Sequence, residues 1–163
     1  MPSTTKIVPN LWFDGQGEDA ARFYTSIFPN SKILEITRYP NVGQEIHGKP
    51  AGSVMTVLFT IEGQEYIALN GGPQFKFSPA FSLQVNVDTQ EEIDALSAKL
   101  SEGGEVGPCG WVTDKFGFSW QVVPRVLEKW IHDPNPAKVE HVMAAMLKMK
   151  KLDISKLKQA YQA

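Results

Sequence analysis

Side-chain amides recur on the predicted strands of this sequence, at positions that we expect to share one strand face. They are Asn10, Asn70, Gln84 and Gln121. Each amide offers both a hydrogen-bond donor and an acceptor. A cleft lined by several of them therefore suits an uncharged or zwitterionic organic ligand with ring or carbonyl groups. Alternatively, the amides bond to one another or to trapped water inside a filled core.

Aromatic and hydroxyl side chains accompany the amides. Trp12 falls on the same predicted strand face as Asn10, and Ser82 on the same face as Gln84. Phe75 and Phe77 lie in a Gly- and Pro-rich connector and could add aromatic surface. The candidate ligand-binding residues are therefore Asn10, Trp12, Asn70, Ser82, Gln84 and Gln121.

Side chains of reactive types are few and give no catalytic assignment. Cys109 stands between Pro108 and Gly110 without a neighbouring His in sequence, and a lone cysteine of this kind is more often inert than nucleophilic. His47 lies in a loop that we expect to face solvent, although it could reach a cleft mouth. The spacing of His132 and His141 matches no zinc motif.

The first half of the chain must position the first three candidates. Its expected elements are a strand over 6–13, a helix over 18–28 and strands over 32–39, 52–61 and 64–70. Strand alternation turns Asn10 and Trp12 away from the helix. The same parity is expected to put Asn70 on that open face, with Ile67 and Leu69 beneath the helix.

The second half repeats this order about 74 residues later. A strand over 81–87 alternates strictly, Thr89 and Glu92 form a capping box for a helix, and 105–123 supplies short strands. The last two strands form a hairpin in which Gly117 can take the positive φ of a tight turn. Two such units can enclose the sheet faces that their helices leave open.

The expected fold is thus α+β, with two βαβββ modules and a helical tail. Module one spans about 5–72 and module two about 80–124, within a paired domain over 1–125. A helical extension over 126–163 follows. A short helix over 125–131 opens this tail, and Asn135 and Pro136 are placed to begin its main helix. The apolar stripe of this tail, which includes Val142 and Met146, must bury on its own sheet or on a second subunit.

Composition narrows the classes of partner. The chain is 42% hydrophobic and 21% charged with a net charge of −2, which gives no reason to expect nucleic acid or a membrane. The tail lysines are interleaved with Leu and Met, as on a solvated helix face. One cysteine excludes an internal disulfide and suits a cytoplasmic location. We expect no membrane span and no signal peptide, because no sufficiently long apolar run is present.

Several stretches together resemble a known family. They are Leu11-Trp-Phe-Asp-Gly15 with Ala20-Ala-Arg-Phe-Tyr24, Ala68-Leu-Asn-Gly-Gly-Pro73, Asp88-Thr-Gln-Glu-Glu92 and Gly110-Trp through Val123. The chain resembles the vicinal oxygen chelate superfamily, which includes glyoxalase I, bleomycin-resistance proteins and extradiol dioxygenases. Within it the sequence is most similar to the PhnB-like branch, often labelled 3-demethylubiquinone-9 3-methyltransferase. The resemblance implies a glyoxalase-like fold, a ligand cleft and a homodimer.

The resemblance also indicates where a metal would be held. Metal-using members place His or Glu on their first, fourth, fifth and eighth strands. The corresponding positions here are Val8, Ala68 or Asn70, Ser82 and Gln121. Neutral amides alone are poor ligands for a divalent ion. We therefore expect no metal and no cofactor.

The sequence predicts a PhnB-like protein that binds a small organic molecule in an amide- and aromatic-lined cleft. One alternative is a metal-dependent lyase, isomerase or dioxygenase of the glyoxalase type. Another is a non-catalytic structural or interaction protein. Methyltransferase activity is not expected, because Gly15-Gln-Gly17 is too short for the Gly-rich loop that holds a nucleotide-type methyl donor.

Overall fold

Both halves of the chain form a four-stranded sheet with the same strand order. The first sheet has the order β1 (Asn10–Phe13), β4 (Gln64–Asn70), β3 (Val54–Ile61), β2 (Lys32–Arg38), and the second β5 (Ser82–Val87), β8 (Ser119–Pro124), β7 (Trp111–Thr113), β6 (Glu105–Val106). In the first sheet β1 is parallel to its neighbour β4, and in the second sheet β5 is parallel to its neighbour β8. All other neighbouring strands are antiparallel. The predicted α+β repeat is confirmed.

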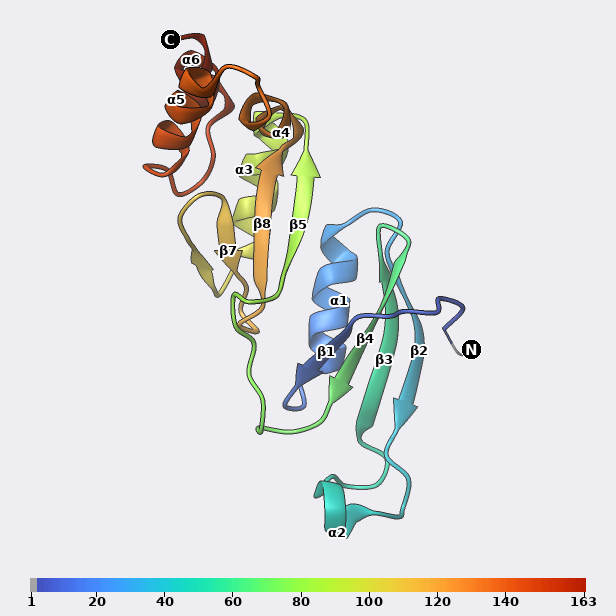
Figure 1. Ribbon diagram of the computed structural model, residues 1–163. Coiled ribbons are helices and arrows are strands. Elements are labelled where there is room, and N and C mark those ends of the chain that lie inside the picture. Colours follow the sequence, from blue (N-terminus) through green and yellow to red (C-terminus); the bar gives the residue numbers. More distant parts are fainter. Residues whose placement is uncertain (1–2) are drawn as a thin grey trace. The chain divides into compact units, whose positions relative to one another are not determined.

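This computed structural model describes residues 3–163, which separate into two compact units (Figure 1). Unit 1 ends at Lys76 and unit 2 begins at Phe77. The C-terminal extension belongs to unit 2. Each unit has its own apolar core and is described separately below.

In unit 1, helix α1 (Gly17–Ile27) covers one face of the first sheet. Leu11 and Phe13 of β1 are buried on that face, whereas Asn10 is exposed. Tyr24 of α1 is fully buried and its ring lies 6.3 Å from that of Phe59 on β3. A short helix, α2 (Gln44–His47), interrupts the connection from β2 to β3. The predicted faces of β1 are therefore correct.

The predicted face of Asn70 is wrong. Asn70 is buried on the helix side of β4, where its Oδ1 accepts a hydrogen bond of 2.8 Å from the Gly17 N–H. Its Nδ2 donates to the Val54 carbonyl at 3.1 Å. Ala68 and Tyr66, two and four residues earlier, are buried on the same side. The side-chain amide thus ties the start of α1 to the sheet instead of facing open space.

In unit 2, helix α3 (Gln90–Leu100) covers the second sheet, and its predicted capping box between Thr89 and Glu92 is present. The β5–β8 register pairs Leu83 with Trp120 and Val85 with Val122. Trp120 and Val122 are fully buried, as expected for residues beneath the helix. The intervening polar positions of β5 therefore lie on the opposite, open face, as predicted.

The β7–β8 hairpin turns through Asp114–Gly117. Gly117 has a φ of 84°, and its N–H donates to the Asp114 carbonyl at 2.9 Å. The Asp114 carboxylate is buried and accepts from the N–H groups of Phe116 and Phe118 and from Trp120 Nε1, at 2.8, 3.0 and 2.9 Å. Asp114 therefore stabilises the turn and also connects it to the core.

The tail forms three helices, α4 (Arg125–Ile131), α5 (Pro136–Met146) and α6 (Ile154–Gln162). They enclose a second core in unit 2, which consists of Leu127, Trp130, Val142, Leu152 and Leu157. The apolar stripe of α5 is therefore buried on its own chain. The predicted cap at Asn135, whose Oδ1 accepts from the Ala137 N–H, is confirmed.

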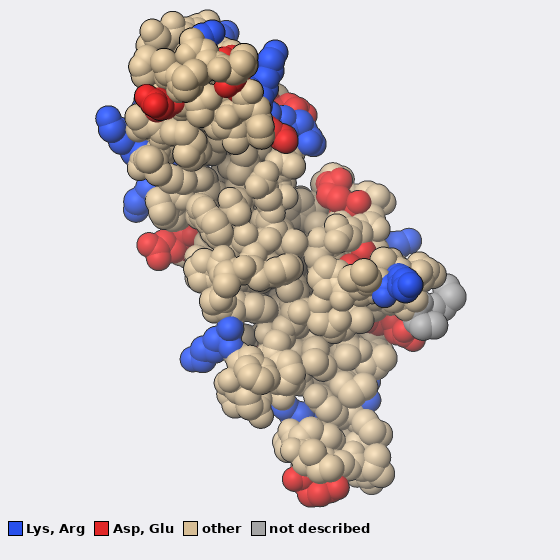
Figure 2. All heavy atoms as spheres, viewed as in Figure 1, with Lys and Arg blue, Asp and Glu red and all other residues tan. Residues whose placement is uncertain are grey.

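Charged side chains of both signs are interspersed on each unit in the view of Figure 2. No helix within residues 3–163 is long and apolar enough to cross a membrane.

An acid-sensitive contact fixes the N-terminal segment to the first sheet. The Glu65 carboxylate accepts hydrogen bonds from the Ser3 hydroxyl and the Thr5 N–H, and these bonds lower the pKa of Glu65 from 4.5 to about 2. Because the folded-state pKa is depressed, the stabilisation is present above pH 4.5 and is lost as the pH falls toward 2. Glu65→Gln should therefore flatten the dependence of the unfolding midpoint on pH in this window. Urea titrations at several pH values measure this slope, and an unchanged slope would contradict the assignment.

Candidate functional site

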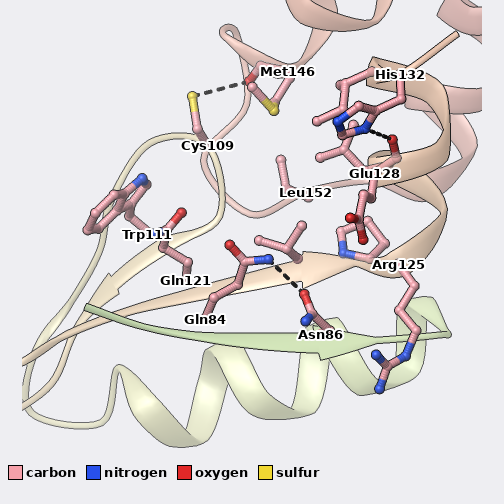
Figure 3. Close-up of a pocket in the computed structure, with 14 residues that line it drawn as sticks. Gln84, Asn86, Cys109, Trp111, Gln121, Arg125, Glu128, His132, Met146 and Leu152 are labelled. Carbon is pink, nitrogen blue, oxygen red and sulfur yellow. Dashed lines mark hydrogen bonds between the residues drawn. The ribbon is translucent and has the colours of Figure 1, made fainter. Parts of the chain in front are cut away.

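A pocket of about 450 Å³ lies in unit 2 between the open face of the second sheet and the tail (Figure 3). Its sheet side is formed by Gln84, Asn86, Trp111, Gln121 and Val123. Its tail side includes Glu128, Ile131, His132, Met146 and Leu152. The volume is within the range of small-molecule sites. Strands of the repeat thus supply the polar wall, and the extension supplies the opposite one.

The polar wall follows directly from strand register. Gln84 of β5 is paired with Gln121 of β8, and Trp111 of β7 is paired with Gln121 from the other side. These three side chains form a row across the sheet because paired residues share a face. Two positions further along β5, Asn86 extends the same polar face.

The amides of the polar wall already form hydrogen bonds to neighbouring side chains. Gln121 Nε2 donates to the Ser82 hydroxyl at 3.0 Å, and Gln84 Nε2 donates to Asn86 Oδ1 at 2.7 Å. Each of these amides has more hydrogen-bonding capacity than these two contacts use. The wall is therefore preorganised by internal bonds and can still make further bonds to a ligand.

Cys109 lies at the edge of the pocket in a strained conformation. Its φ is 55°, in the left-handed region, and its Sγ donates to the Met146 carbonyl at 3.6 Å. Its N–H and that of Gly110 donate to the carbonyls of Met149 and Lys150, at 2.8 and 2.7 Å. Cys109 thus joins the hairpin to the tail, and its thiol is engaged in this junction.

Charged groups at the pocket come from α4. The Arg125 side chain points away from the cavity, and its Nε lies 3.3 Å from Asp88 Oδ1. His132 Nδ1 lies 2.7 Å from the Glu128 carbonyl oxygen, which can only accept, so Nδ1 carries the proton. The Glu128 side chain extends from α4 toward the strand side of the pocket in Figure 3.

The structure separates the predicted candidates into two groups. Gln84 and Gln121 line the pocket, and Ser82 holds Gln121 from the neighbouring strand. Asn10 and Trp12 lie in unit 1, where Trp12 Nε1 donates to the Gly72 carbonyl at 2.8 Å. Asn70 is buried, as described above.

The two connector phenylalanines do not line this pocket. The ring of Phe75 lies 4.9 Å from that of Trp12, at an angle of 78°. The ring of Phe77 lies 5.2 Å from that of Phe118, a fully buried residue of unit 2. Each phenylalanine therefore anchors the connector to one unit.

The residues of the site do not fit a divalent metal ion. The open-face positions where metal-using relatives would carry ligands hold Ser82 and Gln121 on β5 and β8, both neutral. Within residues 3–163, no group of three His, Cys, Asp or Glu side chains is arranged to hold an ion. Neutral amides cannot offset the dehydration of such an ion.

Sequence reasoning missed the tail side of the pocket. Glu128, His132 and Leu152 follow or lie far from the strand repeat, and no strand alternation points to them. One available signal was Pro124, which ends β8 and starts α4 directly, so that the first turn of α4 must lie next to the end of β8. Asn86 and Trp111 share the predicted face but were not among the candidates.

Comparison with known proteins now identifies the family. The sequence model of the family described as 3-demethylubiquinone-9 3-methyltransferase matches residues 5–123. The chain belongs to this family. It is the PhnB-like branch of the vicinal oxygen chelate superfamily, as the sequence motifs predicted. A search of the curated proteins gave no significant match.

Solved structures agree with the PhnB-like assignment. The PhnB protein of Bacillus cereus is 37% identical over 74% of this chain and 99% of its own, with a TM-score of 0.63. The fosfomycin resistance protein FosX of Listeria monocytogenes is 15% identical over 79% of this chain and 98% of its own, with a TM-score of 0.51, and shows a common fold. The family match ends at residue 123, so the tail lies beyond it.

Proposed function

We propose that this PhnB-like protein binds a small organic molecule on the open face of the second sheet, without a metal. The observation that carries the proposal is the convergence of Gln84, Asn86 and Gln121 from two adjacent strands on one wall of a 450 Å³ pocket. Such a wall recognises carbonyl, amide or hydroxyl groups of a ligand through paired donors and acceptors.

Trp111 and the aliphatic tail residues complete the recognition surface. The Trp111 ring adjoins the amide row, and Met146 forms apolar surface opposite, with the buried Leu152 behind it. A ligand with a ring and a carbonyl group can place each part against a matching wall. Ser82 keeps the amide of Gln121 in place. Asn10 and Trp12 remain proposed contacts on the open face of the first sheet.

Gln121→Ala should lower the affinity of the protein for carbonyl-containing fragments about fivefold. This is the effect of losing one neutral hydrogen bond of about 1 kcal/mol. The measurement is a titration of a small fragment library, followed through the NMR signals of the Gln84, Asn86 and Gln121 side-chain amides. Gln159→Ala, an exposed amide on α6, is the matched control and should leave affinity unchanged. If no fragment shifts the pocket amides, or if both variants behave alike, the binding function is wrong.

Metal analysis and native mass spectrometry on the same preparation address the alternatives. A metal-dependent enzyme of the glyoxalase type would carry stoichiometric divalent metal. A purely structural protein would bind no fragment at the amides, and its pocket variants would alter only stability. We also propose that the protein is a homodimer, which native mass spectrometry over a dilution series tests directly.

A further inference from the structure

Hydrogen bonds and an ion pair hold the tail segment 151–154 against helix α3 of the same unit. The Gln90 side chain on α3 donates to the Leu152 carbonyl at 3.1 Å and accepts from the Ile154 N–H at 2.9 Å. Lys151 Nζ lies 2.6 Å from Asp94 Oδ1. Leu152 itself is fully buried in the tail core. These contacts fix the position of residues 151–154 relative to α3.

The tail wall gives the pocket a charge that the strands do not have. The strand side presents neutral amides and an indole. Among the lining residues from α4, Arg125 is paired with Asp88 and directed away from the cavity. Within residues 3–163, no hydrogen bond or ion pair engages the Glu128 carboxylate. The uncompensated charge at the pocket is therefore negative.

The surroundings of Glu128 favour a cation further. The N–H at His132 Nδ1 donates to the Glu128 carbonyl, so in the neutral imidazole the remaining ring nitrogen, Nε2, is an acceptor. The donor of Cys109 is likewise directed to the Met146 carbonyl. Beside these acceptors, Ile131 and Met146 offer an apolar surface for a hydrocarbon body.

We propose that the C-terminal extension selects the ligand, and that the selected class carries a protonated amine on a compact apolar body. The amine meets the Glu128 carboxylate, and the polar remainder of the ligand meets the amide row at Gln84 and Gln121. This inference rests on the proposed function, because it names the ligand class of the same pocket. It assigns selectivity to residues outside the region that matches the family.

Three compounds with one scaffold test the proposal at pH 7.5. They are 4-(aminomethyl)benzamide, 4-(hydroxymethyl)benzamide and 4-carbamoylbenzoate, which share the carboxamide and differ in charge. The cation should bind the intact protein about fivefold more tightly than the neutral alcohol, the effect of one partly exposed ion pair. The preference should fall as salt is raised. The anion should bind most weakly.

Glu128→Gln should abolish the preference for the amine while the alcohol binds as before. Glu140→Gln removes the same charge from an exposed position on α5 and should leave the preference intact. Glu128 is also in the first turn of α4, where a negative charge is stabilised by the helix dipole. If Glu128 had only this structural role, Glu128→Gln would lower the Tm without changing the ratio of amine affinity to alcohol affinity.

The outcomes separate this inference from the proposed function. If the alcohol binds at Gln121 but the amine is not preferred, or if the preference survives in Glu128→Gln, the selectivity inference is overturned and the binding function stands. If the amine does not bind at all, the inference is overturned as well. The binding function is then decided by the fragment titration and Gln121→Ala.

Discussion

Asp114→Ala should lower the free energy of unfolding by about 3 kcal/mol, because it removes the acceptor of three hydrogen bonds in and below the hairpin turn. The carboxylate is 2% exposed and accepts from two backbone N–H groups of the hairpin and from Trp120 Nε1. Alanine can replace none of these acceptors. Trp120 is itself 1% exposed, so water cannot reach its indole N–H without opening the core.

Urea unfolding monitored by tryptophan fluorescence measures this loss. Asp114→Asn keeps one acceptor oxygen and should fall between wild type and Asp114→Ala. Glu102→Ala, an exposed acidic residue of the same unit, should change the stability by no more than about 0.5 kcal/mol. A loss below about 1 kcal/mol for Asp114→Ala would show that the turn does not depend on its carboxylate.

Leu152→Ala should lower the free energy of unfolding by about 3 kcal/mol and loosen the contact between the tail and the hairpin. Leu152 is fully buried between the tail core and Gly110, where its Cδ1 lies 3.1 Å from the position that a Cβ on Gly110 would occupy. Truncating a leucine at such a site removes its transfer free energy and leaves a cavity. The cavity would open onto the ligand pocket, because Leu152 also lines it.

Hydrogen exchange can locate this effect. The N–H groups of Cys109 and Gly110 donate to the tail carbonyls of Met149 and Lys150, so both should exchange faster in Leu152→Ala. Leu147→Ala is the matched control, since Leu147 is 66% exposed and its truncation should be nearly neutral. If protection of the two amides is unchanged while global stability falls, the tail is held by contacts other than Leu152.

The second unit was the more predictable from sequence because its strands alternate cleanly. In β5, Leu83, Val85 and Val87 occupy one face and polar residues the other, so a single assignment of faces satisfies the pattern. The structure agrees, and Gln84 and Gln121 meet across the sheet as this assignment requires. Capping signals at Thr89 and Asn135 were equally local and equally reliable.

β4 shows where alternation fails. Tyr66 and Ala68 occupy one of its faces, and Ile67 and Leu69 the other, so both faces are apolar and neither is marked as the helix side. Strand parity alone had assigned Asn70 to the open face. Its burial is stabilised by specific backbone partners at Gly17 and Val54, which are distant in sequence and leave no periodic signal.

The tail wall of the pocket was unpredictable for a related reason. The apolar stripe on α5 shows that the helix must be buried, but it does not show which surface it covers. That choice depends on contacts such as those of Gln90 with Leu152 and Ile154. An amide on one helix and a backbone segment more than sixty residues later carry no pattern that connects them before the chain folds.

The contacts at Cys109 and Gly110 mean that the limit of family resemblance does not coincide with the limit of a folding unit. Family similarity ends at residue 123, yet two N–H groups before that point have their acceptors at 149 and 150. Trimming the chain to the shared region would expose those donors together with the apolar ends of β8. The extension is thus an integral part of the folded second module, because it supplies the hydrogen-bond acceptors for Cys109 and Gly110.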